Sequence, residues 1–137
     1  MNPRLLITLG LLSILLHSAG CAGLNGFARR TGPAYEAEVQ SWQQIIQEKG
    51  GNGMWLVNRG YRLGDDIVAT ATGSAFPHAA ILDHENEVVI EALWPGNVVT
   101  PLDEFIALSH RVALVQPEAW TPEAGDAALA KARSQLG

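Results

Sequence analysis

The sequence is poor in cysteine and in positive charge, and both shortages limit what the protein can be. It contains one cysteine in 137 residues, so no disulfide can form within one copy of the chain. Lysine and arginine number 9 against 14 aspartate and glutamate residues, a formal net charge of −5. No basic cluster is present that could follow a phosphate backbone. We therefore expect no nucleic-acid partner, and the length fits one small domain.

Common catalytic and metal-binding motifs are also missing. A serine hydrolase of the α/β type would show Gly-x-Ser-x-Gly, and the segment TGSAF around Ser74 does not match it. The residues His78, Asp83, His84 and His110 lack any recognised metal-ligand spacing. We expect neither a metal nor a cofactor.

The first twenty residues have the pattern of a secretory signal. Arg4 supplies a positive charge, and the apolar run from Leu5 to Leu16 is too short for a comfortable transmembrane span. Small residues at 18–20 directly precede Cys21. This arrangement resembles a bacterial lipobox, although Ser18 replaces the usual Leu, Val or Ile. The alternatives are a plain signal peptide that ends beside a lone cysteine, or an uncleaved anchor.

The lipobox resemblance implies a membrane-anchored lipoprotein of the bacterial cell envelope. Residues 1–20 would be the signal peptide, and Cys21 would carry the lipid that binds the membrane. Residues 21–33 would then form a short tether, which we expect to be a solvated linker. The alternative is that its Arg29 and Arg30 lie near anionic lipid head groups. The domain would occupy 34–137 and face the periplasm or the exterior.

The remaining chain predicts an α+β domain with a small antiparallel sheet of about four strands and flanking helices. Apolar residues from Tyr35 to Ile46 recur every three or four positions, which indicates a helix between Pro33 and Gly50. A second helix follows Thr121 and Pro122, with Gly137 at its C-cap position. Four segments read as strands: GDDIVATAT, HAAILD, EVVIEAL and RVALVQP. The segment MWLV fits a strand or a helical turn.

Two charged residues stand in the apolar hairpin formed by HAAILD and EVVIEAL. With a loop of two or four residues, facing positions sum to 169, so His78 lies directly across from Glu91. A loop of three residues would put the two side chains on opposite faces of the sheet. Glu91 could then accept a hydrogen bond from one ring nitrogen and leave the other free, as the acid does in a nucleophile triad. The alternative is a structural ion pair. Trp94, nearby, either lines a cleft or covers the end of the sheet.

The segments GDDIVAT, FPHAAILD, EVVIEALWPG and TPLDEFIALSHRVALVQP together resemble the permuted papain-like cysteine hydrolases of the YiiX/YaeF type, in the NlpC superfamily. The resemblance covers roughly residues 55–137. It implies a permuted papain-like fold, with His78 as the catalytic histidine and Glu91 as its orienting residue. Pro77 stands where that family usually has serine.

In that family the cysteine nucleophile follows the histidine, whereas the cysteine of this chain, Cys21, precedes it. The resemblance therefore implies an incomplete papain-like enzyme: a truncated gene, a fragment or a short inactive relative. One expected function is a thiol hydrolase that cleaves amide bonds in peptidoglycan peptides, or an amide or ester of a lipid-like substrate. The other is a non-catalytic envelope lipoprotein that uses its cleft for binding. We predict no hydrolase activity for the chain as printed.

Overall fold

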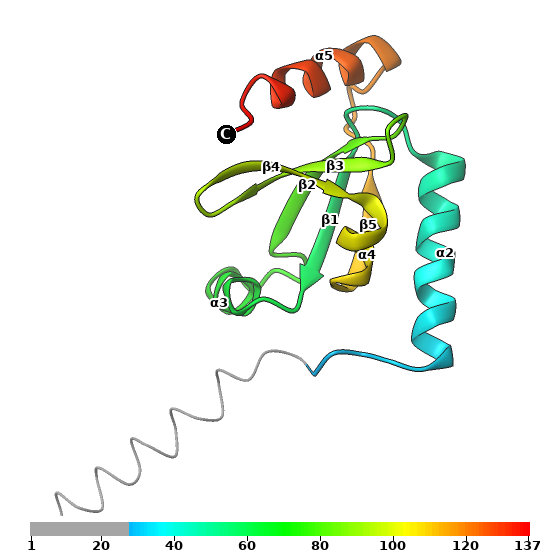
Figure 1. Ribbon diagram of the computed structural model, residues 1–137, viewed down its shortest axis with the longest axis vertical. Helices are drawn as coiled ribbons and strands as arrows, with labels where there is room; N and C mark the ends of the chain where they lie inside the picture. The colour runs from blue at the N-terminus through cyan, green and yellow to red at the C-terminus, as the bar shows by residue number, and fades with distance from the viewer. Residues whose placement is uncertain (1–27) are drawn as a thin grey trace, which may run out of the picture.

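The computed structural model describes residues 28–137, so the expected signal peptide, Cys21 and most of the tether lie outside the described residues. The described part is α+β, as predicted, with one five-stranded antiparallel sheet in the order β4-β3-β2-β1-β5 (Figure 1). Its elements are α2 (Pro33–Lys49), β1 (Trp55–Gly60), α3 (Leu63–Thr72), β2 (His78–Asp83), β3 (Val88–Leu93), β4 (Gly96–Pro101), α4 (Leu102–Ala107), β5 (Ser109–Val115) and α5 (Pro122–Arg133).

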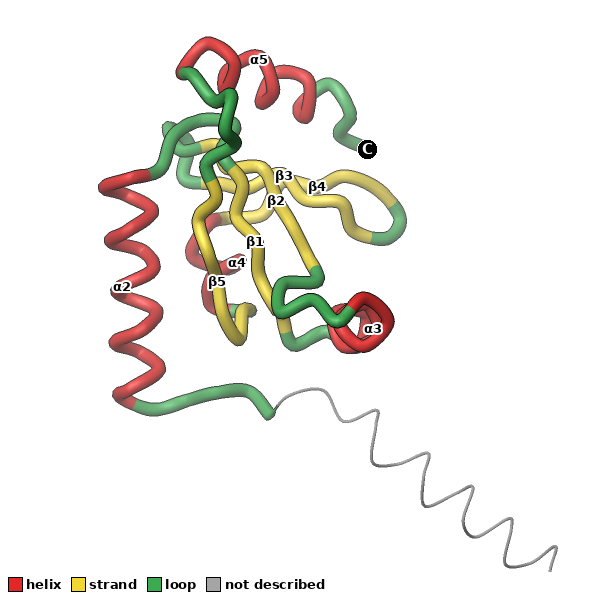
Figure 2. Tube along the Cα trace, turned by 180° about the vertical axis from the view of Figure 1, so that it is seen from behind, coloured by secondary structure: helices red, strands yellow, loops and turns green. Residues whose placement is uncertain are grey.

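The sheet has helices on both faces. Its inner face packs against α2 and α4, and α5 lies over the outer face, where it contacts β2 (Figures 1 and 2). None of the helices within residues 28–137 has the length and apolar character needed to cross a bilayer. The core between the inner face and the helices consists of Ile46, Leu56, Ala80, Leu82, Val89, Phe105 and Ile106.

The two long helices begin where their sequences predict. Helix α2 starts at Pro33 and is capped by Gly50, whose N–H reaches the carbonyl of Ile46. The Thr121 side chain accepts a hydrogen bond from the Ala124 N–H at the start of α5 (3.2 Å). The end of α5 differs from the expected glycine cap, because the helix stops at Arg133 and Ser134 is its C-cap.

The prediction that GDDIVATAT is a strand was wrong, because these residues belong to α3. Its β-branched residues favour a strand, but the end signals that flank this ten-residue segment favour a helix. At the start, Asp65 accepts a hydrogen bond from the Arg62 N–H (3.1 Å). At the end, Gly73 adopts the left-handed conformation with φ 67°. The hydrogen bonds made at the two ends of the helix outweigh the strand propensity of the residues in this short segment.

The prediction of about four strands was also incomplete. The undecided segment MWLV leads into β1, and β4 was not predicted. Its sequence, GNVVTP, is short and lies between a glycine and a proline, which are typical of loops. Pairing with β3 across a tight turn gives these residues the hydrogen-bond partners that make them a strand.

The described end of the tether contacts the domain through both arginines. Arg29 is exposed, as expected for a solvated linker, whereas Arg30 is partly buried, which corrects the expectation at that residue. Arg29 donates from Nη2 to the carbonyl of Ala107 (3.2 Å). The main-chain N–H of Arg30 donates to Tyr61 Oη (3.1 Å), and its Nη1 donates to the carbonyl of His110 (3.1 Å). We call Arg29 and Arg30 the arginine latch, because they join the start of the chain to β5, α4 and the loop after β1.

Candidate functional site

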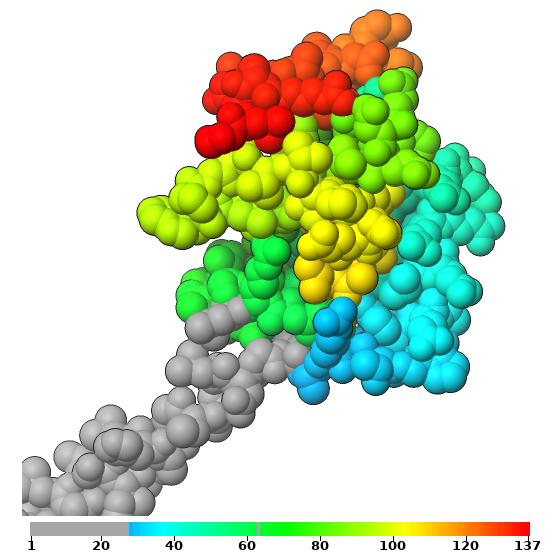
Figure 3. Space-filling view, viewed as in Figure 1, coloured from blue at the N-terminus to red at the C-terminus, as the bar shows by residue number. Residues whose placement is uncertain are grey.

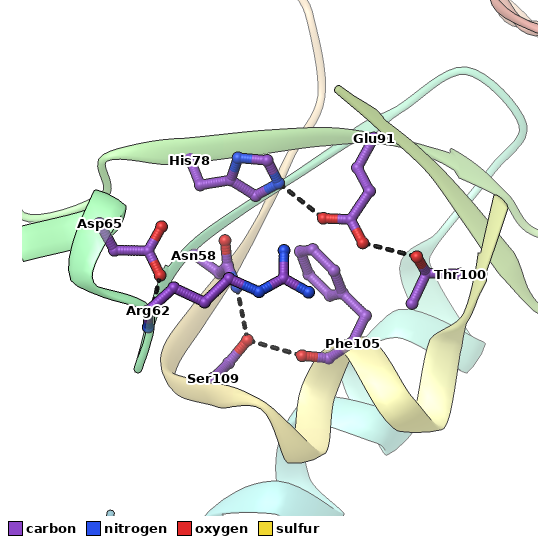
Figure 4. A network of polar contacts seen from close by, with 8 residues as sticks. All are labelled: Asn58, Arg62, Asp65, His78, Glu91, Thr100, Phe105 and Ser109. Carbon is purple, nitrogen blue, oxygen red and sulfur yellow. Dashed lines mark hydrogen bonds and ion pairs between the residues drawn. The ribbon is translucent and has the colours of Figure 1, made fainter. Parts of the chain in front are cut away.

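His78 and Glu91 lie on the inner face of the sheet and contact each other through their side chains. His78 opens β2, and its Nε2 lies 2.7 Å from Glu91 Oε2 on β3 (Figure 4). The contact expected from the hairpin is therefore confirmed. The catalytic role of the two residues stays a prediction.

The register that brings them together differs from the predicted one. Glu91 pairs with Ala80, so facing residues sum to 171 and His78 lies diagonally from Glu91. A shift of two positions keeps every side chain on its original face. Diagonal neighbours in a sheet remain within reach of long side chains such as glutamate and histidine. The contact survives because the predicted register was wrong by an even number.

Glu91 is almost fully buried, with 4% of its surface exposed. Its second oxygen, Oε1, accepts a hydrogen bond from Thr100 Oγ1 on β4 (2.6 Å). Burial by itself raises the pKa of Glu91, but the hydrogen bonds from His78 and Thr100 outweigh it and lower the pKa below the usual value. Glu91 is therefore a carboxylate at neutral pH.

The charge of Glu91 decides which nitrogen of His78 can act as a base. A carboxylate only accepts hydrogen bonds, so Nε2 of a neutral His78 carries the proton and Nδ1 keeps its lone pair. Nδ1 has no hydrogen-bond partner among residues 28–137. His78 is also held by packing, since its ring centroid lies 6.3 Å from that of Phe105. The arrangement presents one basic nitrogen in a fixed orientation.

A second polar chain flanks His78 and was missed in the sequence. Asn58 on β1 is the direct cross-strand neighbour of His78. Its Nδ2 donates to Ser109 Oγ (2.7 Å), and Ser109 Oγ donates to the carbonyl of Phe105 (2.7 Å). The signal was present, because Asn58 follows the inward-facing Leu56 by two positions and so points into the core.

A small cavity of about 20 Å³ adjoins these residues, enough space for about one water molecule. Arg62 lines it and extends toward the His78–Glu91 pair, where its positive charge contributes to the lowered pKa of Glu91 (Figure 4). Asp65 lines it as well. Gly60 allows this approach, because a Cβ there would lie 2.3 Å from Asp65 Oδ2.

Other residues singled out in the sequence lie apart from this site. Trp94 is 98% exposed, so it neither lines a cleft nor covers the sheet. His84 lies in the turn between β2 and β3, and His110 packs edge-on against Tyr61, with 5.9 Å between ring centroids. Within the part of the chain that the structure describes, no three His, Cys, Asp or Glu residues gather closely enough to hold a metal ion. Cys21 lies outside that part.

A nucleophile for His78 is not found within residues 28–137. These residues include no cysteine. Ser109 is fully buried and is held by Asn58 and Phe105. Ser74 Oγ is engaged with the main chain of Phe76 (2.9 Å). The described site therefore contains the His78–Glu91 pair without a side chain placed to serve as its nucleophile.

Comparison of the chain with family models, curated proteins and solved structures found no match.

Proposed function

We propose that the protein is a lipoprotein of the cell envelope, anchored through Cys21, and that its domain takes part in thiol-dependent hydrolysis. His78 acts as the general base and Glu91 as its orienting acid. The bond attacked is an amide, or an ester of a lipid-like substrate. The thiol is not among residues 28–137, and the proposed permuted papain-like arrangement would place it C-terminal of His78.

The observation that carries this proposal is the 2.7 Å contact between His78 Nε2 and Glu91 Oε2, in a histidine whose Nδ1 has no partner among residues 28–137 and which helps to line a cavity. A carboxylate that holds one imidazole nitrogen fixes the tautomer and stabilises the imidazolium that forms when the other nitrogen takes a proton. The site is thus suited to take a proton from a thiol and to return it to a leaving group.

The test supplies the missing thiol from solution. The purified full-length chain is mixed with an acyl ester reporter and a small thiol, and transfer of the acyl group to the thiol is followed. General-base catalysis typically contributes ~10²–10⁴-fold, so wild-type protein should accelerate the transfer and His78→Ala should not. The matched control is His84→Ala, which removes a histidine from the same hairpin.

Equal rates for wild type and His78→Ala, in proteins with the same circular dichroism spectrum, would show that His78 is not a base. Without the added thiol we expect no turnover. Turnover that needs His78 but no thiol would show that the chain carries a nucleophile of its own.

The lipid anchor has its own test. Metabolic labelling with a clickable fatty acid should tag the wild-type protein, and Cys21→Ala should remove the tag, because the lipid is attached to the sulfur of Cys21. A tag that persists in Cys21→Ala would mean that the lipobox was misread.

A second candidate function, a binding lipoprotein without catalysis, is favoured by one observation. A cleft of about 420 Å³ lies between the outer sheet face and α5, lined mainly by apolar residues that include Trp55, Ile81, Ile90 and Ala132. Its size and character suit an apolar small molecule. Binding of a fluorescent fatty acid that is lost in Ile81→Asp and kept in His78→Ala would support this function.

A further inference from the structure

Helix α3 presents an unusual surface to the solvent. Both of its acidic side chains bind groups of the domain. Asp65 accepts a hydrogen bond from the Arg62 N–H, and Asp66 Oδ1 pairs with Arg59 Nη2 (3.0 Å). The outward side carries Ile67 and Val68, which are 57% and 42% exposed. No charged residue is exposed on α3. Helices that face water normally carry charged or polar residues on that side.

The other long helices of the same domain follow the usual pattern. Helix α2 exposes Glu36, Glu38, Glu48 and Lys49, and α5 exposes Glu123, Asp126, Lys131 and Arg133. Apolar side chains are also exposed at Ile45 on α2 and at Trp94, Val98 and Val99 in the β3–β4 hairpin. Among these three helices, however, α3 is the one that exposes no charged residue.

The arginine latch is bound at that same end. Arg30 contacts Tyr61, which lies two residues before α3, and its Nη2 also pairs with Glu38 (2.5 Å). The guanidinium of Arg30 lies over the Tyr35 ring, 5.0 Å from its centroid. The described chain therefore begins close to α3, at the lower end in Figures 1 and 3.

Charge is distributed unevenly between this end and the rest of the domain. We define the latch end as residues 28–38, 59–73 and 107–111. It holds five arginines and four acidic residues, whereas the rest of the described chain holds three basic and ten acidic residues. An anionic bilayer would repel the rest of the domain, which is acidic, and would not repel the latch end, where arginines outnumber acidic residues.

The distance from the latch to Cys21 is short. Arg29 is the eighth residue after Cys21, and eight residues span at most ~29 Å when fully extended. If Cys21 carries a lipid in the membrane, the latch keeps the α3 end within that reach of the bilayer. A stable protein interface needs ~20–30 residues on each side, which the short α3 does not offer. A lipid anchor already concentrates the domain at the bilayer, so a small apolar surface suffices there.

We propose that the exposed face of α3, with Ile67 and Val68 at its centre, rests on the anionic phospholipid bilayer that holds Cys21. This inference rests on the proposed lipid anchor. It orients the domain, because the cavity beside His78 is lined by Arg62 and Asp65 from the start of α3. The His78 site then lies at the membrane-facing end, and the cleft under α5 lies away from it.

The experiment uses the mature lipidated protein in vesicles of phosphatidylethanolamine and phosphatidylglycerol. The variants Val68→Cys and Ala127→Cys each receive one environment-sensitive dye, since the sulfur of Cys21 is blocked by its lipid. Both positions are exposed, on α3 and α5 respectively. The Val68 probe should shift to shorter wavelength and lose most of its fluorescence to nitroxide-labelled lipids, and the Ala127 probe should do neither. Adding Ile67→Asp should abolish the quenching of the Val68 probe, and the matched Ala128→Asp should not.

The possible results distinguish a failure of the proposed contact between α3 and the bilayer from a failure of the proposed lipid anchor. Protein that floats with the vesicles but leaves the Val68 probe unquenched would overturn the contact and leave the anchor intact. A wavelength shift without lipid quenching would indicate a protein partner, such as a second copy, and would also overturn it. Protein that carries no fatty-acid label and does not float would overturn the anchor and the contact together.

Discussion

Asp83 and Glu91 lie at opposite ends of the same β2–β3 hairpin and are almost equally buried, with 1% and 4% of their surfaces exposed. Asp83 faces the outer side, where its oxygens accept hydrogen bonds from Asn86 Nδ2 (2.9 Å) and from Arg133 on α5. Glu91 faces the inner side and is held by a histidine and a threonine. The two carboxylates differ in their partners and hardly in their burial.

This difference separates a structural carboxylate from one suited to chemistry. Arginine keeps its proton at all relevant pH values, so the Asp83 pair is a permanent link between the hairpin and α5. Histidine gains and loses a proton near neutral pH, and Nδ1 of His78 is unpaired within the described residues. A buried carboxylate thus points to function only when its partner can change protonation.

The largest expected effect is on the rate of acyl transfer, when Glu91 is replaced by glutamine. In Glu91→Gln the amide can donate to His78 Nε2 and so move the imidazole proton to Nδ1, which removes the base. We expect His78-dependent acyl transfer to an added thiol to fall by ~10²-fold or more, as for the loss of an orienting acid in other triads. Asp83→Asn is the control and should leave the reaction rate unchanged. Equal losses in both variants would mean that the carboxylates act through stability alone.

The next largest effect is on the free energy of unfolding, when the carboxylate of Asp83 is removed. Asp83→Ala removes the acceptor for Asn86 and Arg133, and we expect the free energy of unfolding in urea to fall by ~1–3 kcal/mol. Arg133 is about half exposed, so it stays hydrated and the charge pair itself contributes little of that loss. The control is Glu85→Ala, an exposed residue in the same turn. An unchanged urea midpoint in Asp83→Ala would show that α5 is held without this link.

A third prediction concerns pH. The pKa of Glu91 is lower in the folded protein than in the unfolded chain, so its charge stabilises the fold above the unfolded value of about 4.3. That contribution is lost as the pH falls below 4.3 toward the folded pKa. We expect the stability advantage of wild type over Glu91→Gln to shrink as the pH falls below about 4.3. Urea midpoints of both proteins across this range would measure it, and a difference that grows on acidification would contradict it.

The smallest expected effect comes from removing the hydrogen bond between Thr100 and Glu91. Thr100→Val keeps the shape of the side chain and removes the hydrogen bond to Glu91 Oε1. We expect a loss of ~0.5–1.5 kcal/mol in the free energy of unfolding. The pKa of Glu91 should also rise, since one of the hydrogen bonds that lower it is gone. The pKa can be read from the carboxyl carbon by NMR, and an unchanged value would assign the lowering to His78 and Arg62.

Several parts of the fold were predictable because the signals for them are local. Pro33 and Gly50 mark the ends of α2, and Thr121 caps α5, since helix ends need partners for their main-chain groups. The hairpin of β2 and β3 was visible as two apolar runs around a polar turn. The nature of α3 was missed, because β-branched residues in GDDIVATAT masked its end signals.

The site was predictable in part for the same reason. A histidine and a glutamate in apolar strands need a partner, and the alternation of side chains along strands put both on one face. Asn58 and Thr100 were missed, since they come from β1, which was left undecided, and from β4, which was not predicted. Their place beside His78 and Glu91 depends on which strands are neighbours in the sheet.

The sequence by itself determined the α+β composition, the starts of both long helices, the end of α2 and, for a hairpin loop of even length, the shared face of His78 and Glu91. These follow from backbone periodicity and from helix-end hydrogen bonding, which involve residues close together in the chain. Only the tertiary structure decided the register of the hairpin, the neighbours of His78 and the binding of the arginine latch beside α3. Those depend on contacts between residues far apart in the chain, such as Arg29 and Ala107, and on packing that no local pattern encodes.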